Sequence, residues 1–162
     1  MIIEFKGSCG FLSNFYPCPI TYEGLTYPTS EHAFQAAKSL DRGTRLMILE
    51  LPNPRSAKYA GRRIELREDW EDVKLAVMKK ILQLKFNPEK RQEMAARLHA
   101  TGSKLLCEGN NWGDDYWGAI WVPKKRPGYR NWAGAPGGPV LSGHNHLGII
   151  LMGIRPYIVL DE

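Results

Sequence analysis

Three side chains with complementary chemistry lie close together between residues 27 and 38. Glu31, Gln35 and Lys38 are spaced four and three residues apart, so in a helix they share one face. The carboxylate can transfer protons, the amide can hold a polar group, and a neutral amine can attack an electrophilic carbon. The same spacing also fits an ordinary charge pair on a solvated face. Which of the two holds depends on whether the helix is buried and on what surrounds it.

The sequence around these residues predicts the helix that would carry them. Pro28 favours an extended backbone before it, and Thr29 or Ser30 can accept hydrogen bonds from the first free N–H groups of the helix. Several positions between the polar residues are alanines, which suit burial. A hairpin over residues 20–27, with its turn at Gly24, is expected to lead directly into this helix.

Length and composition indicate a single globular domain over residues 1–162. The chain is 43% hydrophobic and 24% charged, and its length is sufficient to bury a core. Cys9, Cys18 and Cys107 show no CxxC spacing, so neither a zinc site nor a disulfide is predicted, and no metal or cofactor is expected. The sequence shows no signal-peptide pattern and no long apolar run, which predicts a cytoplasmic protein without a membrane span.

The chain carries an excess of positive charge. Its formal net charge is +5 and its pI is about 9.2, which favours anionic partners such as phosphates, nucleotides or nucleic acid. One basic run comprises Lys58, Arg62, Arg63 and Arg67. It fits either a phosphate contact or a solvated run of charges.

Two helices are expected in the middle of the chain. Asn53 and Pro54 are typical of a helix start and predict a helix over residues 54–60 that Gly61 ends. Asp69 is expected to cap the next helix, whose apolar stripe faces the core. That stripe consists of Trp70, Val73, Val77, Ile81 and Leu84. The lysines of this helix, Lys85 among them, are expected mostly outside the stripe.

Further elements follow from local signals. A strand is expected over residues 1–5, and a helix is expected to start at Asn87–Pro88 and to stop before Gly102. Two more strands are expected over residues 104–108 and 119–122. The apolar segment 149–155 predicts a packed helix that Pro156 ends.

Residues 123–142 have an unusual composition. They contain four prolines, four glycines and four basic residues without an acid, and a long loop is expected. A loop of this length is usually functional or disordered. With Tyr129 and Trp132, its charge suits a phosphate-bearing or single-stranded nucleic acid ligand, and a mobile surface excursion is the alternative.

Several segments together resemble the NADAR (YbiA-like) family of N-glycosidases. They are residues 13–16, 27–38, 69–70, 115–118 and 143–148, with Leu151, Met152 and Arg155. The resemblance implies an α+β fold: one compact, helix-rich domain with a short N-terminal hairpin and a small sheet. It also implies hydrolysis of the C1–N bond of ribosylamine-type substrates. These are ADP-ribose linked to the guanine amino group, possibly within nucleic acid, or phosphoribosylamino-pyrimidine intermediates of riboflavin synthesis.

The resemblance also assigns roles to residues of this sequence. Glu31, Lys38 and Asp115 are the implied catalytic residues. The implied substrate-binding residues are Asn14, Phe15, Gln35, Trp70, Trp117, Gly118, Asn145 and Arg155. Segment 123–142 is longer than the corresponding connection in the family, which bears on the substrate more than on the chemistry.

Two catalytic schemes and one non-catalytic function fit these residues. In the first scheme Lys38 attacks C1 to form a Schiff base, and Glu31 moves protons to the ring oxygen and the leaving amine. In the second, Glu31 and Asp115 act on a water as a pair of carboxylates. The non-catalytic alternative is a module that binds ADP-ribose or single-stranded nucleic acid.

Overall fold

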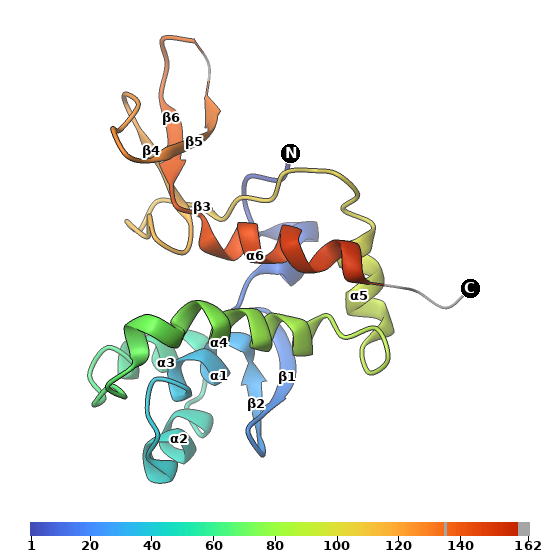
Figure 1. The fold of residues 1–162 in the computed structure, drawn as a ribbon, viewed down its shortest axis with the longest axis vertical. Helices are drawn as coiled ribbons and strands as arrows, with labels where there is room; N and C mark the ends of the chain where they lie inside the picture. The colour runs from blue at the N-terminus through green and yellow to red at the C-terminus, as the bar shows by residue number, and fades with distance from the viewer. Residues whose placement is uncertain (135, 159–162) are drawn as a thin grey trace. The chain divides into compact units, whose positions relative to one another are not determined.

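The computed structural model describes residues 1–134 and 136–158, and within them the chain forms two units (Figure 1). The helical unit is Asn14–Ala95, and the sheet unit combines Met1–Ser13 with Ala96–Glu162. The expectation of one domain over residues 1–162 stays a prediction.

The helical unit begins with the expected hairpin. Strands β1 (Pro17–Tyr22) and β2 (Leu25–Thr29) pair antiparallel. Glu23 and Gly24 join them with φ angles of 46° and 79°, the left-handed pair that a tight two-residue hairpin turn requires. The prediction is confirmed, and the hairpin leads into helix α1 without a linker.

Helix α1 (Ser30–Ala36) is the centre of the helical unit (Figure 1). The Thr29 hydroxyl accepts a hydrogen bond from the backbone N–H of His32, as the sequence predicts, and also lies 2.8 Å from the Nδ1 of His32. All seven helical residues are buried, because α1 packs against α2 (Arg42–Leu49), α3 (Pro54–Ala60) and α4 (Trp70–Lys85).

Helix α1 ends before Lys38, which corrects one expectation. Ala37 is its C-cap, and the N–H of Lys38 bonds to the carbonyl of Gln35 in a following turn. The carbonyl of Lys38 accepts a hydrogen bond from the N–H of Arg67 at 2.7 Å. Lys38 therefore lies one residue beyond the C-cap and outside the helix that carries Glu31 and Gln35.

Helix α3 has the predicted boundaries, and α4 begins where predicted, directly after Asp69. Asn53 accepts a hydrogen bond from the N–H of Ser56 and caps α3. Asp69 precedes α4 but pairs with Arg67 at 2.5 and 2.9 Å instead of capping the helix. The prediction for Lys85 is wrong: its side chain is fully buried, because it lies three residues after buried Leu82 on the core-facing stripe.

The sheet unit has a four-stranded sheet with the order β3-β4-β6-β5. The strands are β3 (Gly109–Asn110), β4 (Ala119–Val122), β5 (Arg130–Gly134) and β6 (Val140–Gly143). The pair β3–β4 is parallel, and the other pairs are antiparallel. Cys107, Ala119, Trp132 and Leu141 form the buried cluster on this sheet.

Helical segments complete the sheet unit, and α5 crosses the boundary between the two units in the sequence. They are η1 (Gly7–Leu12), α5 (Gln92–His99), α6 (His146–Ile154) and η2 (Arg155–Tyr157). The helices and small sheets of the two units give the predicted α+β fold. None of the helices in the described parts of the chain has the length and apolar character needed to cross a membrane.

Several expected elements of the sheet unit differ from the structure. The strands over residues 1–5 and 104–108 reduce to one bridge between Ile2 and Leu106. Asn87 caps a turn by accepting from the N–H of Lys90, so α5 begins only at Gln92. The expected loop over residues 123–142 contains β5 and the first three residues of β6, which its prolines and glycines conceal in the sequence.

Candidate active site

Glu31 is a buried carboxylate with a fixed orientation. Only 5% of the residue is exposed, and its backbone N–H bonds to the carbonyl of Asn14 at 3.0 Å. The side-chain amide of Gln35 donates to the Glu31 Oε1 at 2.8 Å. The spacing of four residues predicted that Glu31 and Gln35 would meet, and within α1 they do.

Three buried polar atoms on residues that adjoin or contact Glu31 have no hydrogen-bond partner among the described residues. They are Asn14 Oδ1, Ser30 Oγ and Gln35 Oε1. Leaving a buried polar atom unpaired costs about 1–3 kcal/mol, so such atoms are rare and often functional. Ser30 precedes Glu31, the amide of Gln35 binds its carboxylate, and the carbonyl of Asn14 binds its backbone N–H, so the three unpaired atoms mark this region as a candidate site.

Lys38 is the second ionisable group of this site. Its side chain is half-buried, and its Nζ donates a hydrogen bond to the carbonyl of Gly61 at 3.1 Å. Burial lowers the pKa of Lys38, the carboxylate of Glu31 opposes this effect, and the cations of Lys58 and Arg62 lower the pKa further. The lowered pKa increases the neutral fraction of the amine, which is the nucleophilic form.

Gly61, which follows the end of α3, lies against the side chains of both Gln35 and Lys38. A Cβ at this position would lie 1.9 Å from the Oε1 of Gln35, so only glycine leaves room for that amide. Its φ of −63° is ordinary, and the requirement is therefore one of space. The side chains of Gln35 and Lys38 both depend on this one turn.

Aromatic and cationic side chains border the site within the helical unit. The Lys38 Nζ lies 6.0 Å from the ring centre of Trp70, which is buried and packs on Phe34 at 5.1 Å. Phe15 is 38% exposed, and the Nζ of Lys58 lies 6.0 Å from its ring centre. This border can hold an aromatic base together with an anionic group.

The remaining predicted site residues belong to the sheet unit. The carboxylate of Asp115 pairs with Arg126 at 2.8 Å. Trp117 is half-buried, with the ring of Tyr116 at 5.1 Å and that of His146 at 6.2 Å. The structure thus brings together Asn14, Phe15, Glu31, Gln35, Lys38 and Trp70 in one unit, and it holds Asp115, Trp117, Gly118, Asn145 and Arg155 in the other.

Three of the predicted site residues in the sheet unit, Asn145, Gly118 and Arg155, make close contacts with the backbone of other segments. The amide of Asn145 accepts from the N–H of Glu108 and donates to the carbonyl of Leu106. A Cβ on Gly118 would lie 2.2 Å from the carbonyl of Glu108. The guanidinium of Arg155 donates to the Thr101 hydroxyl and to the carbonyl of Lys104. These contacts give the three residues structural roles, and their substrate contacts stay predictions.

The structural roles of two buried residues, Asn110 and Lys85, were not predicted from the sequence. Asn110 is buried, and its side chain bonds to the backbone of Asp114 and Ala119, which shapes the turn that carries Asp115. Lys85 is buried beside aromatic rings, 5.8 Å from Tyr16 and 5.3 Å from Phe86. The position of Lys85 on the helix could have indicated that it is buried. Nothing in the turn-rich segment around Asn110 indicated the role of that asparagine.

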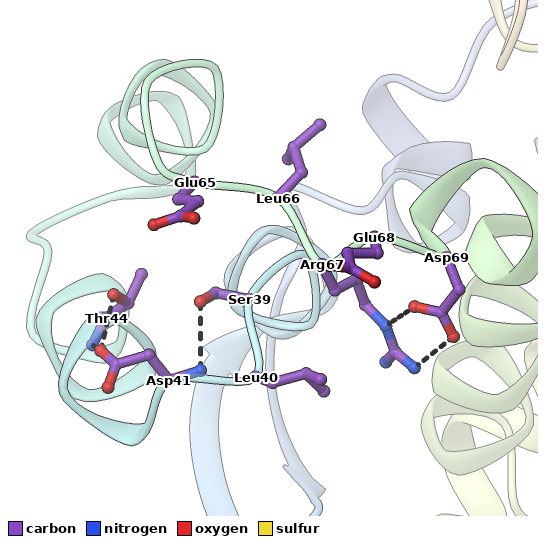
Figure 2. Close-up of a pocket in the computed structure, with 9 residues that line it drawn as sticks. All are labelled: Ser39, Leu40, Asp41, Thr44, Glu65, Leu66, Arg67, Glu68 and Asp69. Carbon is purple, nitrogen blue, oxygen red and sulfur yellow. Dashed lines mark hydrogen bonds and ion pairs between the residues drawn. The ribbon is translucent and has the colours of Figure 1, made fainter.

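A separate cavity of about 620 Å³ opens on the helical unit (Figure 2). Ser39, which follows Lys38 in the sequence, is one of its lining residues, and four of the lining residues are acidic. Its lining residues are Ser39, Leu40, Asp41, Thr44, Glu65, Leu66, Arg67, Glu68 and Asp69. Figure 2 shows that Asp41 bonds to Thr44 and that Arg67 bonds to Asp69. Its acidic lining makes it unsuited to an anionic substrate, and it contains neither Glu31 nor Gln35.

The chain is similar to known proteins over most of its length. The NADAR domain family matches residues 4–159. The N-glycosidase YbiA of Escherichia coli K12 is 37% identical over 155 residues, which cover 94% of this chain and 84% of that protein. The NMR structure of E. coli YbiA superposes with a TM-score of 0.72, covering 97% of this chain and 84% of that one. A riboflavin biosynthesis protein of Vibrio vulnificus is 34% identical over 148 residues, 90% of this chain and 35% of that protein.

The α+β fold is the one seen in the solved structure of E. coli YbiA. The chain belongs to the NADAR domain family, and the predicted resemblance is confirmed. Its relatives include proteins named N-glycosidases.

Proposed function

We propose that this protein hydrolyses the C1–N bond of ribosylamine-type substrates, with Glu31 as acid and base and Lys38 as nucleophile. The observation that carries the proposal is geometric: the turn at Gly61 lies against the Gln35 amide that binds the buried carboxylate of Glu31, and its carbonyl accepts a hydrogen bond from the amine of Lys38. Burial also lowers the pKa of that amine. Ionisable groups that environment shifts in this way are typical of catalytic sites. Membership of a family with N-glycosidase relatives supports the same class of reaction.

The proposed substrates carry an exocyclic amine on C1 of ribose. They are ADP-ribose on the guanine amino group or a phosphoribosylamino-pyrimidine, and the name of the Vibrio relative, a riboflavin biosynthesis protein, supports including the second. Such a linkage can open to an iminium when the ring oxygen takes a proton. The chemistry therefore needs a proton donor at the ring oxygen, a nucleophile at C1 and a base that recovers the proton.

Each step can be written with the two residues of the helical unit. Glu31 donates a proton to the ring oxygen, and the neutral amine of Lys38 adds to C1 of the resulting iminium. Proton transfer to the substrate nitrogen then breaks the C1–N bond, releasing the base with its amino group and leaving C1 doubly bonded to Nζ. Water adds to this Schiff base, and collapse of the adduct returns the free sugar and the amine of Lys38.

The border of the site fits the other parts of these substrates. Lys58 and Arg62 are near enough to affect the pKa of Lys38, and their charges suit a phosphate or pyrophosphate. The partly exposed ring of Phe15 can stack on a base. In the two-carboxylate scheme Asp115 would replace Lys38, but the ion pair with Arg126 already occupies one of its oxygens, which favours the amine.

The test is an assay of released base with both substrates, using the wild-type protein and Glu31→Gln. Glutamine keeps the size of the side chain and its hydrogen bond with Gln35, so the fold should survive. We expect kcat to fall by about two to four orders of magnitude. Glu65→Gln, which removes an exposed acid from the cavity of Figure 2, is the control and should retain activity. No release from either substrate by the wild-type protein, or a wild-type rate for Glu31→Gln, would disprove the proposal.

A further inference from the structure

The excess positive charge of the chain is concentrated in one segment of the sheet unit. The formal net charge is +5. Residues 116–158 contain five cations and no acid, which equals the entire net charge, so cations and acids balance over the rest of the sequence. These cations are Lys124, Lys125, Arg126, Arg130 and Arg155. Charge segregated in this way produces a local positive potential that attracts a polyanion.

The register of the sheet places an exposed aromatic ring and one of these cations on the same face. Trp121 in β4 is opposite Leu141 in β6, and Arg130 in β5 is opposite Gly143. Leu141 and Gly143 are two residues apart in one strand, so their partners share a face. Trp121 is 46% exposed, although most tryptophans are largely buried.

The turn after β4 extends this surface. Lys124 and Lys125 are exposed and follow Trp121 by three and four residues. Figure 1 shows β4, β5 and β6 side by side and extending away from α6. Trp121, Lys124, Lys125 and Arg130 together are called the β4–β5 surface.

The face that carries Trp121 and Arg130 also carries the buried residues Ala119 and Leu141, so the exposed side chains of the β4–β5 surface adjoin the structural cluster of the unit. Trp132, which the sequence suggested as a ligand contact, is buried and donates its Nε1–H to the carbonyl of Gly143. The guanidinium of Arg130 lies 4.3 Å from the ring centre of Trp132, which restricts its position. Arg126 is paired with Asp115 and stacked on Tyr129 at 3.8 Å, so it is not counted in the surface.

We propose that the β4–β5 surface binds single-stranded nucleic acid. Lys124, Lys125 and Arg130 contact backbone phosphates, and an unpaired base stacks on the ring of Trp121. Cations with an exposed aromatic ring are the combination that binds single strands without sequence preference. In a duplex the faces of the bases are covered, so the ring would contribute little there. The inference goes beyond the glycosidase activity, because it uses neither Glu31 nor Lys38.

The experiment measures binding to an unmodified oligonucleotide, which does not depend on catalysis. Fluorescence anisotropy of a labelled twelve-nucleotide oligo(dT) is recorded with the wild-type protein over a range of salt concentrations. Replacing Lys124, Lys125 and Arg130 together by Gln should raise Kd at least tenfold. It should reduce the slope of log Kd against log salt by about two, because each lost phosphate contact removes about 0.7. Trp121→Ala should raise Kd about tenfold or more, whereas Trp121→Phe should keep most of the affinity.

A matched control removes the same charge elsewhere. Lys79, Lys80 and Lys90 are exposed lysines of the helical unit, and their joint replacement by Gln should leave Kd and the salt slope close to wild type. Thermal unfolding checks that each variant is folded.

Three results would overturn the proposal. The first is equal affinity of the surface variant and its control. The second is equal binding of a duplex of the same length together with no effect of Trp121→Ala, which would indicate a general polyanion patch. The third is binding to vesicles that contain phosphatidylserine but not to the oligonucleotide, which would indicate a membrane partner. Failure of the glycosidase assay would leave this test unaffected.

Discussion

The carbonyl oxygen of Gly61 accepts a hydrogen bond from the Nζ of Lys38 at 3.1 Å. The same glycine contacts the Oε1 of Gln35, which in turn donates from its Nε2 to Glu31. One turn at the end of α3 therefore determines where the proposed nucleophile and the partner of the proposed acid lie. A substitution in this turn should therefore reduce activity more strongly than it reduces the stability of the fold.

Gly61→Ala tests this dependence. The added Cβ would lie 1.9 Å from the Gln35 Oε1, so the amide must move and its hydrogen bond to Glu31 should weaken. We expect kcat to fall by up to about 100-fold, since small misplacements of catalytic groups have such effects, with a loss of about 1–3 kcal/mol in the free energy of unfolding. Kinetics and urea denaturation measure the two effects.

Gly153→Ala is the matched control for this substitution. Gly153 lies in α6, and among the described residues no atom beyond its own helix backbone and chain neighbours lies within 4 Å of the position that a Cβ would take. Alanine there should stabilise the helix by about 0.5–1 kcal/mol and leave kcat unchanged. Similar activity of the two alanine variants would contradict the role of Gly61.

Lys38→Arg tests the nucleophile. Arginine keeps the positive charge but cannot form a Schiff base at neutral pH, so we expect no turnover with the fold intact. Borohydride added to the wild-type protein during turnover should leave a sugar adduct on Lys38, which peptide mapping by mass spectrometry can locate.

The same peptide map distinguishes two other outcomes. An adduct on the buried Lys85 would transfer the role of nucleophile to that residue. Turnover by Lys38→Arg without any adduct would instead support the two-carboxylate scheme with Glu31 and Asp115. Either result would contradict the assignment of Lys38.

Elements with local signals could be predicted from the sequence. Thr29 and Asn53 cap α1 and α3 through hydrogen bonds within their own first turn, and Gly24 is in the hairpin turn where its φ is needed. Such contacts join residues only a few positions apart, so residue type and spacing specify them. The meeting of Glu31 and Gln35 could be predicted for the same reason.

Features that depend on distant contacts could not be predicted. The hydrogen bond from Arg67 to the carbonyl of Lys38 joins segments far apart in the sequence, and it accompanies the early end of α1. Lys85 was placed outside the core because of its charge, although its position on the helix favours burial. The strands within residues 123–142 are short and interrupted by turns, and their pairing depends on β4.

His32 should make the stability of the fold depend on pH. Burial lowers its pKa, and the hydrogen bond to the carbonyl of Leu51 only partly opposes this. Below about pH 6.5, the ordinary pKa of histidine, the unfolded chain binds a proton that the folded chain does not. The free energy of unfolding should therefore decrease as the pH falls, by up to about 1.4 kcal/mol per pH unit from this group, until the folded-state pKa is passed.

Urea denaturation between pH 7.5 and pH 5 measures this effect. His32→Gln should reduce the loss of stability over that interval, even if its stability at pH 7.5 is lower. His99→Gln, at an exposed position, should retain the wild-type dependence on pH. Equal slopes for the wild-type protein and His32→Gln would contradict the prediction.

Arg62 should affect the rate through the pKa of Lys38. Its cation, like that of Lys58, lowers this pKa by disfavouring the protonated amine. Removing the charge in Arg62→Gln should therefore raise the pKa of Lys38 and reduce the neutral fraction at pH 7. Because the neutral amine is the nucleophile, the ascending limb of kcat/KM against pH should move to higher pH, with kcat/KM lower near neutrality and less affected on the high-pH plateau.

The profile is best recorded at low ionic strength, since salt screens a charge at an exposed position, and added salt should reduce the difference from wild type. Arg55→Gln removes an exposed cation from α3 and should leave the limb in place. A limb that stays fixed in Arg62→Gln, or moves to lower pH, would show that the amine of Lys38 does not set the rate.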